Sequence, residues 1–193
     1  MDTSTDKNSP KIFINPVIEK RAKNKITKDY FFYSGNFNNI NSKYFIDKIN
    51  EGIKEESNLN RQTNLKSDMT SWNFFNNDSE FFNLLWPIFD FIDEELNPFE
   101  NKYFLFESWG FKSSLGDYTI KHDHDSNNTF VSGVIYLNEH SQVLEFPQIK
   151  QTIKPGKGNF GIFSQFLKHK CKRNLHKKEK YGISFNIAKE MNK

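Results

Sequence analysis

Two histidines and two aspartates occupy consecutive positions 122–125 (HDHD), directly before an apolar and β-branched run. Side chains two residues apart in a strand point to the same face. His122 and His124 therefore project together, and Asp123 and Asp125 project to the other side. Two imidazoles on one face can chelate a divalent metal and leave coordination positions open. The alternative is a polar loop with solvated histidines.

A third ligand has to come from a distant strand, and His169 in the segment FGIFSQFLKHKCKRN is the candidate. A β-bulge in the HDHD segment would shift the alternation by one residue. Such a bulge would bring Asp123 or Asp125 to the metal, so Asp125 stays an alternative to His124. The alternation itself favours His124.

The elements that must position these residues change character along the chain. Apolar spacing predicts helices at residues 41–58 and 78–97, with a kink or break at Pro87. The rest of the first half has the character of mixed helix and loop. Residues 103–190 form seven or eight short segments rich in Phe, Tyr, Val and Ile, separated by Gly, Asn, Pro and Ser. Strands that follow helices, rather than alternating with them, predict a mainly β fold: a double-stranded β-helix (jelly roll, cupin-like) flanked by helices.

The length of 193 residues suits one domain. We expect a flexible tail at residues 1–10 and a single domain at 11–193. Within that domain, helical support covers roughly 41–97 and the jelly-roll core covers roughly 103–190. The sequence carries no signal for an oligomeric state.

Charge and cysteine content exclude several classes of protein. A net charge of +3 is too small to indicate a nucleic-acid partner, and the basic residues 168–180 have the character of a solvated loop. The single cysteine, Cys171, excludes a disulfide framework and a Cys-rich zinc site, and predicts a reducing, cytoplasmic location. No run is long enough to span a membrane. His140 and His176 fall in expected loops, and we interpret both as solvated.

The order of these features resembles that of the iron(II)- and 2-oxoglutarate-dependent oxygenases. The resemblance is best over residues 109–186. Residues 63–72 (TNLKSDMTSW) also resemble the N-terminal pattern of the prolyl-hydroxylase-like subgroup of marine bacteria and phages. The matching features, in chain order, are His122 with His124, the run SGVIYLN, the Pro155-Gly156 turn, the run GNFGIFS, His169 and Lys180.

This resemblance implies an activity and a role for each matched residue. His122, His124 and His169 would bind Fe(II), and Lys180 would hold the far carboxylate of the cosubstrate 2-oxoglutarate. The enzyme would hydroxylate a small-molecule or peptidyl substrate and release succinate and CO2. No catalytic residue beyond the metal ligands is implied. If the protein is viral, the compartment would be the host cytoplasm.

The sequence departs from the common pattern of this superfamily at three positions. His124 stands where many members have Asp, so three neutral imidazoles leave the metal at +2 and the dianionic cosubstrate neutralises it. Lys180 stands where Arg is usual, and lysine cannot offer the bidentate fork of a guanidinium. Gly182 stands where Ser often follows.

Other residues are expected to complete or support the site. The last strand should place Lys180, Gly182, Ser184 and Asn186 on the face toward the site, and the intervening apolar residues on the other face. Tyr118 and Tyr136 are expected to reach the cosubstrate or substrate, and Trp109 is expected in the core.

Two further functions stay open at this point. One is a three-histidine, cupin-type dioxygenase that uses no 2-oxo acid. The other is a non-enzymatic jelly-roll binding module whose histidines are incidental.

Overall fold

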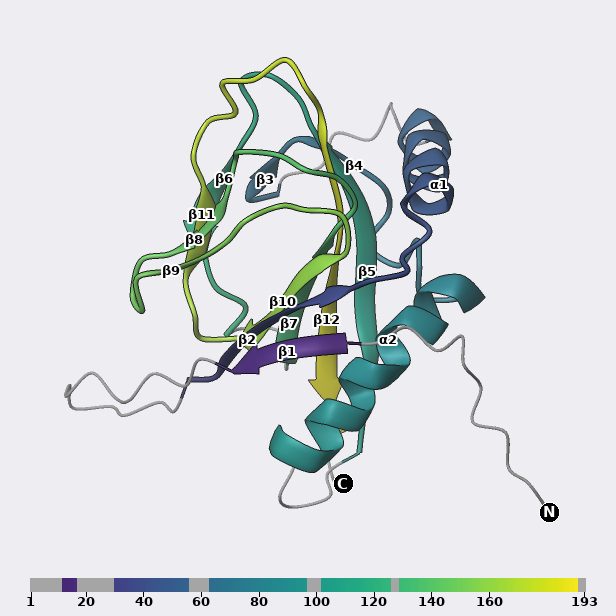
Figure 1. Ribbon diagram of the computed structural model, residues 1–193, viewed down its shortest axis with the longest axis vertical. Coiled ribbons are helices and arrows are strands. Elements are labelled where there is room, and N and C mark those ends of the chain that lie inside the picture. Colours follow the sequence, from purple (N-terminus) through teal and green to yellow (C-terminus); the bar gives the residue numbers. More distant parts are fainter. Residues whose placement is uncertain (1–11, 17–29, 56–62, 97–101, 126–128, 191–193) are drawn as a thin grey trace.

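Two antiparallel sheets and two helices form the described part of the protein (Figure 1). The structure is a computed structural model that describes residues 12–16, 30–55, 63–96, 102–125 and 129–190. The expected flexible tail, residues 1–10, lies outside these ranges. The expected mainly β fold with flanking helices is confirmed.

The larger sheet has seven strands and the smaller has five. In spatial order, the larger contains β1 (Ile12–Pro16), β2 (Phe32–Phe37), β10 (Asn159–Ser164), β7 (Thr129–Tyr136), β12 (Lys180–Lys189), β5 (Tyr103–Ser113) and β4 (Asp68–Met69). The smaller contains β3 (Leu65–Lys66), β6 (Tyr118–His122), β11 (His169–Cys171), β8 (Leu144–Phe146) and β9 (Gln151–Ile153). Every neighbouring pair is antiparallel, as a double-stranded β-helix requires.

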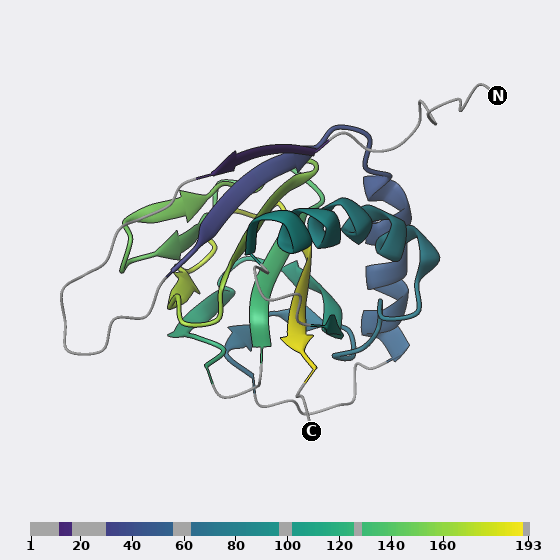
Figure 2. The same cartoon turned by 90° about the horizontal axis from the view of Figure 1, so that it is seen from below.

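The helices pack on the face of the larger sheet that points away from the smaller sheet (Figure 2). They are α1 (Ser42–Glu55) and α2 (Ser79–Phe91), and α2 continues into the π-helical turn η1 (Ile92–Leu96). Ile49 of α1 and Phe81 of α2 are fully buried in one cluster with Ile183 and Phe185 of β12. This apolar layer fixes one face of β12 against the helices.

Asp78 ties the two helices together. Its carboxylate caps α2 by accepting from the Phe81 N–H at 2.9 Å, and it accepts from the Tyr44 hydroxyl of α1 at 2.8 Å. Lys48 of α1 forms an ion pair with the same carboxylate. Burial alone would raise the pKa of Asp78, but the hydrogen bonds from Lys48, Phe81 and Tyr44 outweigh it and lower the pKa.

Of the kink or break expected at Pro87, the break does not occur, because α2 runs without interruption from Ser79 to Phe91. The carbonyl left without its usual donor belongs to Asn83, an exposed residue. Two other expectations were wrong. The first half is not only helix and loop, since β2 pairs with β10. His140 is buried rather than solvated, because its ring accepts from the Gln142 N–H and bonds to the Lys178 carbonyl.

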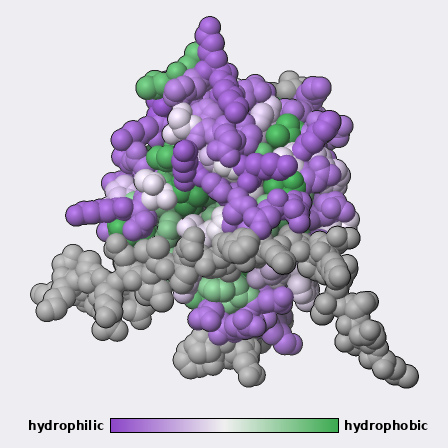
Figure 3. All heavy atoms as spheres, in the orientation of Figure 1, coloured by the Kyte–Doolittle hydropathy of each residue, from purple (hydrophilic) through white to green (hydrophobic). Residues whose placement is uncertain are grey.

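The outer surface is mostly hydrophilic on the face seen in Figure 3, where hydrophobic side chains form only small separate patches. Among the described residues, no helix has the length and apolar character needed to cross a membrane.

Candidate metal and cosubstrate site

A cavity of about 280 Å³ lies between the two sheets. Its walls come from β5, β7 and β12 of the larger sheet, from β6 and β11 of the smaller one, and from the segment around residues 63–72. The volume is close to the lower end of the range of about 300–1,000 Å³ for ligand pockets. The segment at residues 63–72, far from the jelly-roll strands in sequence, therefore contributes to the cavity.

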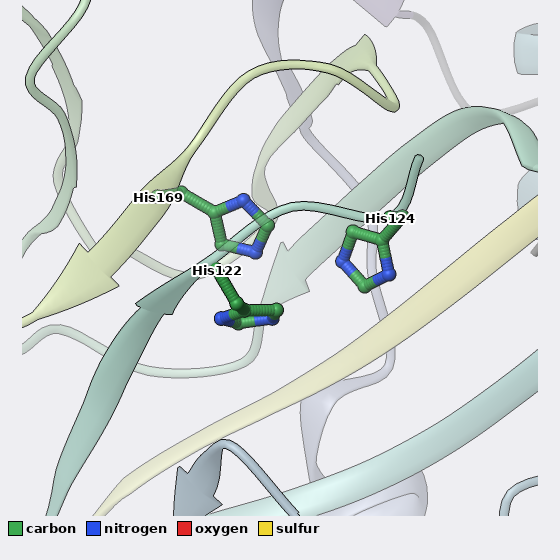
Figure 4. Close-up of side chains that lie close together, drawn as sticks. All are labelled: His122, His124 and His169. Carbon is green, nitrogen blue, oxygen red and sulfur yellow. The ribbon is translucent and has the colours of Figure 1, made fainter. Parts of the chain in front are cut away.

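Three histidines meet on the cavity wall formed by the smaller sheet (Figure 4). His122 of β6 lies directly opposite His169 of β11 in the strand register, with ring centroids 4.3 Å apart. His124 follows the end of β6, where its backbone N–H donates to the Gln165 carbonyl at 2.9 Å. Its ring stacks on that of His169 at 5.2 Å. The potential ligand nitrogens of the three residues all lie within 4.8 Å of one another.

Backbone hydrogen bonds orient two of these rings. Nδ1 of His122 lies 2.8 Å from the Ile120 carbonyl, and Nδ1 of His169 lies 3.0 Å from the Leu167 carbonyl. A carbonyl oxygen only accepts, so Nδ1 carries the proton in both rings. The lone pair of Nε2 is then free for a metal, which is the usual arrangement of a metal-binding histidine.

Burial keeps all three imidazoles neutral. It lowers the pKa of His122 and lowers that of His169 well below the ordinary value. Burial and the neighbouring His122 lower the pKa of His124 to about 3. Neutral imidazole is the form that binds metals, so these side chains need not lose a proton near neutral pH.

The aspartates of the HDHD segment lie apart from this cluster. Asp123 faces Lys168, with a carboxylate oxygen 3.8 Å from Nζ, and Asp125 is exposed. Among the described residues, only the three histidines form a group close enough to share one ion. His124, which strand alternation favours over Asp125, is therefore the residue that lies with the cluster, although it follows the end of β6 at His122.

Lys180 enters the same cavity from the first position of β12. Its residue surface is only 2% exposed. Nζ donates to the Gln142 carbonyl at 3.4 Å and lies 3.7 Å from Sγ of Cys171. No carboxylate forms an ion pair with it among the described residues, and burial lowers the pKa of this ammonium. Lys180 is thus a buried cation in a ligand-sized cavity without an anionic partner from the described chain.

Aromatic rings surround the Lys180 side chain. Nζ lies 5.8 Å from the ring centre of Phe111 and 5.7 Å from that of Tyr136. A side chain at Gly182 would collide with Phe111, because a Cβ there would lie 2.6 Å from its ring. Gly182 therefore makes room for the ring that covers Lys180.

Most of β12 follows the expected alternation. Ser184 and Asn186 line the cavity with Lys180, while Tyr181, Ile183, Phe185 and Ile187 belong to the core cluster on the helix side. Phe185 also reaches the cavity wall, and Gly182 does not line the cavity. Asn186 is six residues from Lys180, or about 20 Å along the strand at roughly 3.3 Å per residue. Lys180 and Asn186 thus belong to opposite ends of the cavity.

Of the two tyrosines, only Tyr136 lines the cavity. Tyr118 does not: its neighbour Thr119 lines the cavity instead, and the guanidinium of Arg173 lies over the Tyr118 ring, 5.0 Å from its centre. The register between β6 and β11 shifts between Thr119 and His122, so these two residues both line the cavity although they are three positions apart. Trp109 is buried as expected, and it also forms part of the cavity wall.

Sequence reasoning missed several cavity residues. Glu107 shares a face of β5 with Trp109, so the alternation already applied to β12 would have found it. The same argument applies to Ser132 on β7. Cys171 lies two residues after His169 on β11, so alternation would have found it as well. Trp72 carries no periodic signal that points to the cavity.

The comparisons with known proteins find relatives in structure only. No protein family model matches the sequence, and no curated protein matches it. A Pseudomonas putida prolyl-4-hydroxylase has a TM-score of 0.61 at 16% identity over 78% of this chain and 86% of its own. The viral collagen prolyl hydroxylase of Paramecium bursaria Chlorella virus-1, solved with 2-oxoglutarate, has a TM-score of 0.59 at 16% identity over 76% and 88%.

A third solved structure is HygX from Streptomyces hygroscopicus, with nickel, 2-oxoglutarate and hygromycin B bound. Its TM-score is 0.59 at 10% identity, over 82% of each chain. At these identities the likeness establishes the fold, which is that of the 2-oxoglutarate- and Fe(II)-dependent oxygenases.

Proposed function

We propose that this protein is an Fe(II)- and 2-oxoglutarate-dependent oxygenase. It would hydroxylate a substrate bound at the end of the cavity where Asn186 lies, called the outer end below, while Lys180 lies at the inner end. The products would be the hydroxylated substrate, succinate and CO2. The observation that carries the proposal is Lys180, a buried ammonium group that shares one cavity with three converging histidines.

The three histidines fit one divalent ion. Nitrogens about 2.1 Å from a shared ion are separated by roughly 3–4 Å, and the ligand atoms here lie within 4.8 Å of one another. Small rotations of the side chains close the difference. His122, His124 and His169 would hold the ion on one side and leave the cavity side open.

Lys180 fits the far carboxylate of 2-oxoglutarate. A buried charge without a partner is costly, and an anionic ligand would remove that cost. The rings of Phe111 and Tyr136 lie beside Nζ, so the carboxylate would be held away from water. Lysine neutralises a carboxylate as a point charge, without a bidentate fork.

When bound, the iron, the 2-oxo acid and O2 supply the oxidising power of the reaction. The residues of the chain position the metal ligands and the cosubstrate and shield them from water. The Ile120 and Leu167 carbonyls fix the imidazoles of His122 and His169, Lys180 orients the cosubstrate, and the aromatic rings exclude water.

The test compares metal binding and 2-oxoglutarate turnover in matched variants. His169→Ala should lose Fe(II) binding, measured by metal analysis after anaerobic loading, and should produce no succinate. His176→Ala, at an exposed histidine away from the cavity, should match the wild type in both measurements. Succinate production that survives His169→Ala would refute the proposed ligand set.

A second pair of variants decides whether His124 or Asp125 is the second metal ligand. His124→Ala should lose the metal, whereas Asp125→Ala should retain it. The reverse result would mean that the carboxylate is the ligand.

A cupin-type dioxygenase without a 2-oxo acid is favoured by one observation, the absence of a carboxylate among the three converging residues. In this alternative, no anionic cosubstrate would pair with the ammonium group of Lys180. Calorimetric binding of 2-oxoglutarate to the metal-loaded protein distinguishes the two functions, since only the proposed oxygenase requires it.

A further inference from the structure

We infer that the outer end of the cavity recognises a cationic group of the substrate, such as a protonated amine, through the carboxylate of Glu107. The inference rests on the proposed function only in so far as the bound molecule is taken to be the substrate of the oxygenase. The recognition itself depends only on residues of this chain.

A chain of hydrogen bonds across three neighbouring strands holds Glu107 in place. The Ser132 hydroxyl of β7 donates to Oδ1 of Asn186 on β12 at 2.8 Å. Nδ2 of Asn186 then donates to Oε2 of Glu107 on β5 at 2.9 Å. Ser132 and Asn186 are almost fully buried. The second oxygen of the carboxylate, Oε1, takes no hydrogen bond from the described residues.

Glu107 has no cationic partner among the described residues. The other acidic side chain of the cavity wall, Asp123, already faces Lys168 at 3.8 Å. Lys180 lies near the opposite end of the cavity, because its position on β12 is six residues before that of Asn186. Glu107 thus gives the outer end a negative charge that the chain described here does not neutralise.

Two indole rings line the cavity together with this carboxylate. Trp109 shares the cavity face of β5 with Glu107, two residues away. Trp72 accepts a hydrogen bond from the Ser108 N–H at 2.8 Å through its carbonyl, and its ring centroid lies 4.7 Å from that of Trp109 at an interplanar angle of 73°. Trp72 is 37% exposed. Cations bind well over indole faces, so a carboxylate with two indoles favours a protonated amine over a neutral or anionic group.

The two charged ends of the cavity therefore have opposite preferences. Lys180 suits an anion, and Glu107 suits a cation. Since the histidines lie on the facing wall, an anionic cosubstrate and a cationic substrate would enter the cavity without competing for one charged residue.

The experiment compares two probes that differ by one charge. The first is Nα-acetyl-lysine N-methylamide, and the second is the same compound with a methyl group in place of the ammonium. Calorimetry measures their binding to the full chain, once without metal and cosubstrate and once with Zn(II) and 2-oxoglutarate. The wild type should bind the cationic probe about ten times more tightly or better, as expected for a hydrogen bond to a charged group.

Glu107→Gln should remove this preference and leave the affinity of the neutral probe unchanged. The glutamine keeps an oxygen that can accept from Asn186, so the variant removes the charge with little disturbance of the packing. Asp123→Asn, the matched change at the other carboxylate, should keep the preference. Equal binding of the two probes by the wild type, no binding of either, or a preference that survives Glu107→Gln would each overturn the inference.

The two arms separate this inference from the proposed function. Failure of 2-oxoglutarate to bind would count against the oxygenase. The preference for the cation in the arm without metal and cosubstrate would still be measured.

Discussion

The two faces of β12 differ in what they bury, although their residues alternate along a single strand. On the helix side, Tyr181, Ile183, Phe185 and Ile187 pack into a continuous apolar cluster. On the cavity side, Lys180 and Asn186 are just as buried but are polar or charged. Asn186 has protein partners on both sides, whereas Lys180 has no carboxylate partner in the described chain.

This difference shows how one strand serves both stability and binding. Apolar burial against the helices stabilises the fold by about 25 cal/mol per Å². A buried ammonium without an anion costs free energy until a ligand supplies one. Substitutions on the two faces should therefore affect different measurements.

The largest expected effect on stability comes from the helix side. Ile183→Ala removes a fully buried side chain from the cluster and should lower the free energy of unfolding by about 2–5 kcal/mol. Urea denaturation followed by circular dichroism measures this loss. The folded fraction should bind 2-oxoglutarate with unchanged affinity, and a weakened affinity would show that the two faces are not independent.

The cavity side should give the opposite result. Lys180→Met keeps the length of the side chain and removes the charge, so unfolding should cost at least as much free energy as in the wild type. The affinity for 2-oxoglutarate should fall by about 100-fold or more, as expected when one partner of a buried charge pair is lost. An unchanged dissociation constant in calorimetry would rule out Lys180 as the anchor.

Asp78 is a buried charge on the helix side that does have its partners, and so it provides a contrast to Lys180. Asp78→Ala removes the N-cap of α2 and the hydrogen bond from Tyr44. It should lower the free energy of unfolding by about 1–2 kcal/mol. Burial raises the pKa of Asp78, but the hydrogen bonds from Lys48, Phe81 and Tyr44 outweigh it and lower the pKa overall. The loss should therefore be largest above the ordinary pKa of aspartate and should shrink as the pH falls through the folded value. A loss that is constant with pH would contradict this role.

The smallest expected effect is the pH dependence contributed by Lys180. Burial lowers its pKa in the folded protein, so the unfolded chain holds this proton to a higher pH. The free energy of unfolding of the wild type therefore rises with pH between the folded pKa of Lys180 and the ordinary lysine value, because the folded protein no longer has to bury the charge. The stability advantage of Lys180→Met over the wild type should be full below this window and should shrink across it. Denaturation of both proteins over a pH series measures the difference, and parallel curves would mean that Lys180 is not held as a buried cation.

Much of the fold was predictable because the spacing of apolar residues along the sequence indicates the helices and strands. The segments from residue 103 onward match the observed strands closely, and the helices at 42–55 and 79–91 fall within the expected ranges. The strand β2 was missed because its sequence, FYSGNF, contains the Ser-Gly-Asn pattern of a turn. It becomes a strand through pairing with β10, a contact between residues more than 120 positions apart.

The site was predictable to the extent that it follows from alternation. The His-x-His spacing selects His122 and His124, but only the register of β6 and β11 places His169 opposite His122. That Lys180 has no carboxylate partner in the described chain depends on tertiary packing, which no local pattern encodes. Glu107 was missed because the alternation argument was applied to β12 and not to its neighbour β5.

The contact between Cys171 and Lys180 gives the molecule a built-in chemical reporter. Cys171 is the only cysteine of the chain, and its sulfur lies 3.7 Å from the ammonium at the inner end of the cavity. A ligand that reaches Lys180 also covers this thiol. The rate at which a small alkylating reagent adds a single mass increment to the protein would therefore reveal occupancy of the inner end, with no substrate and no turnover required.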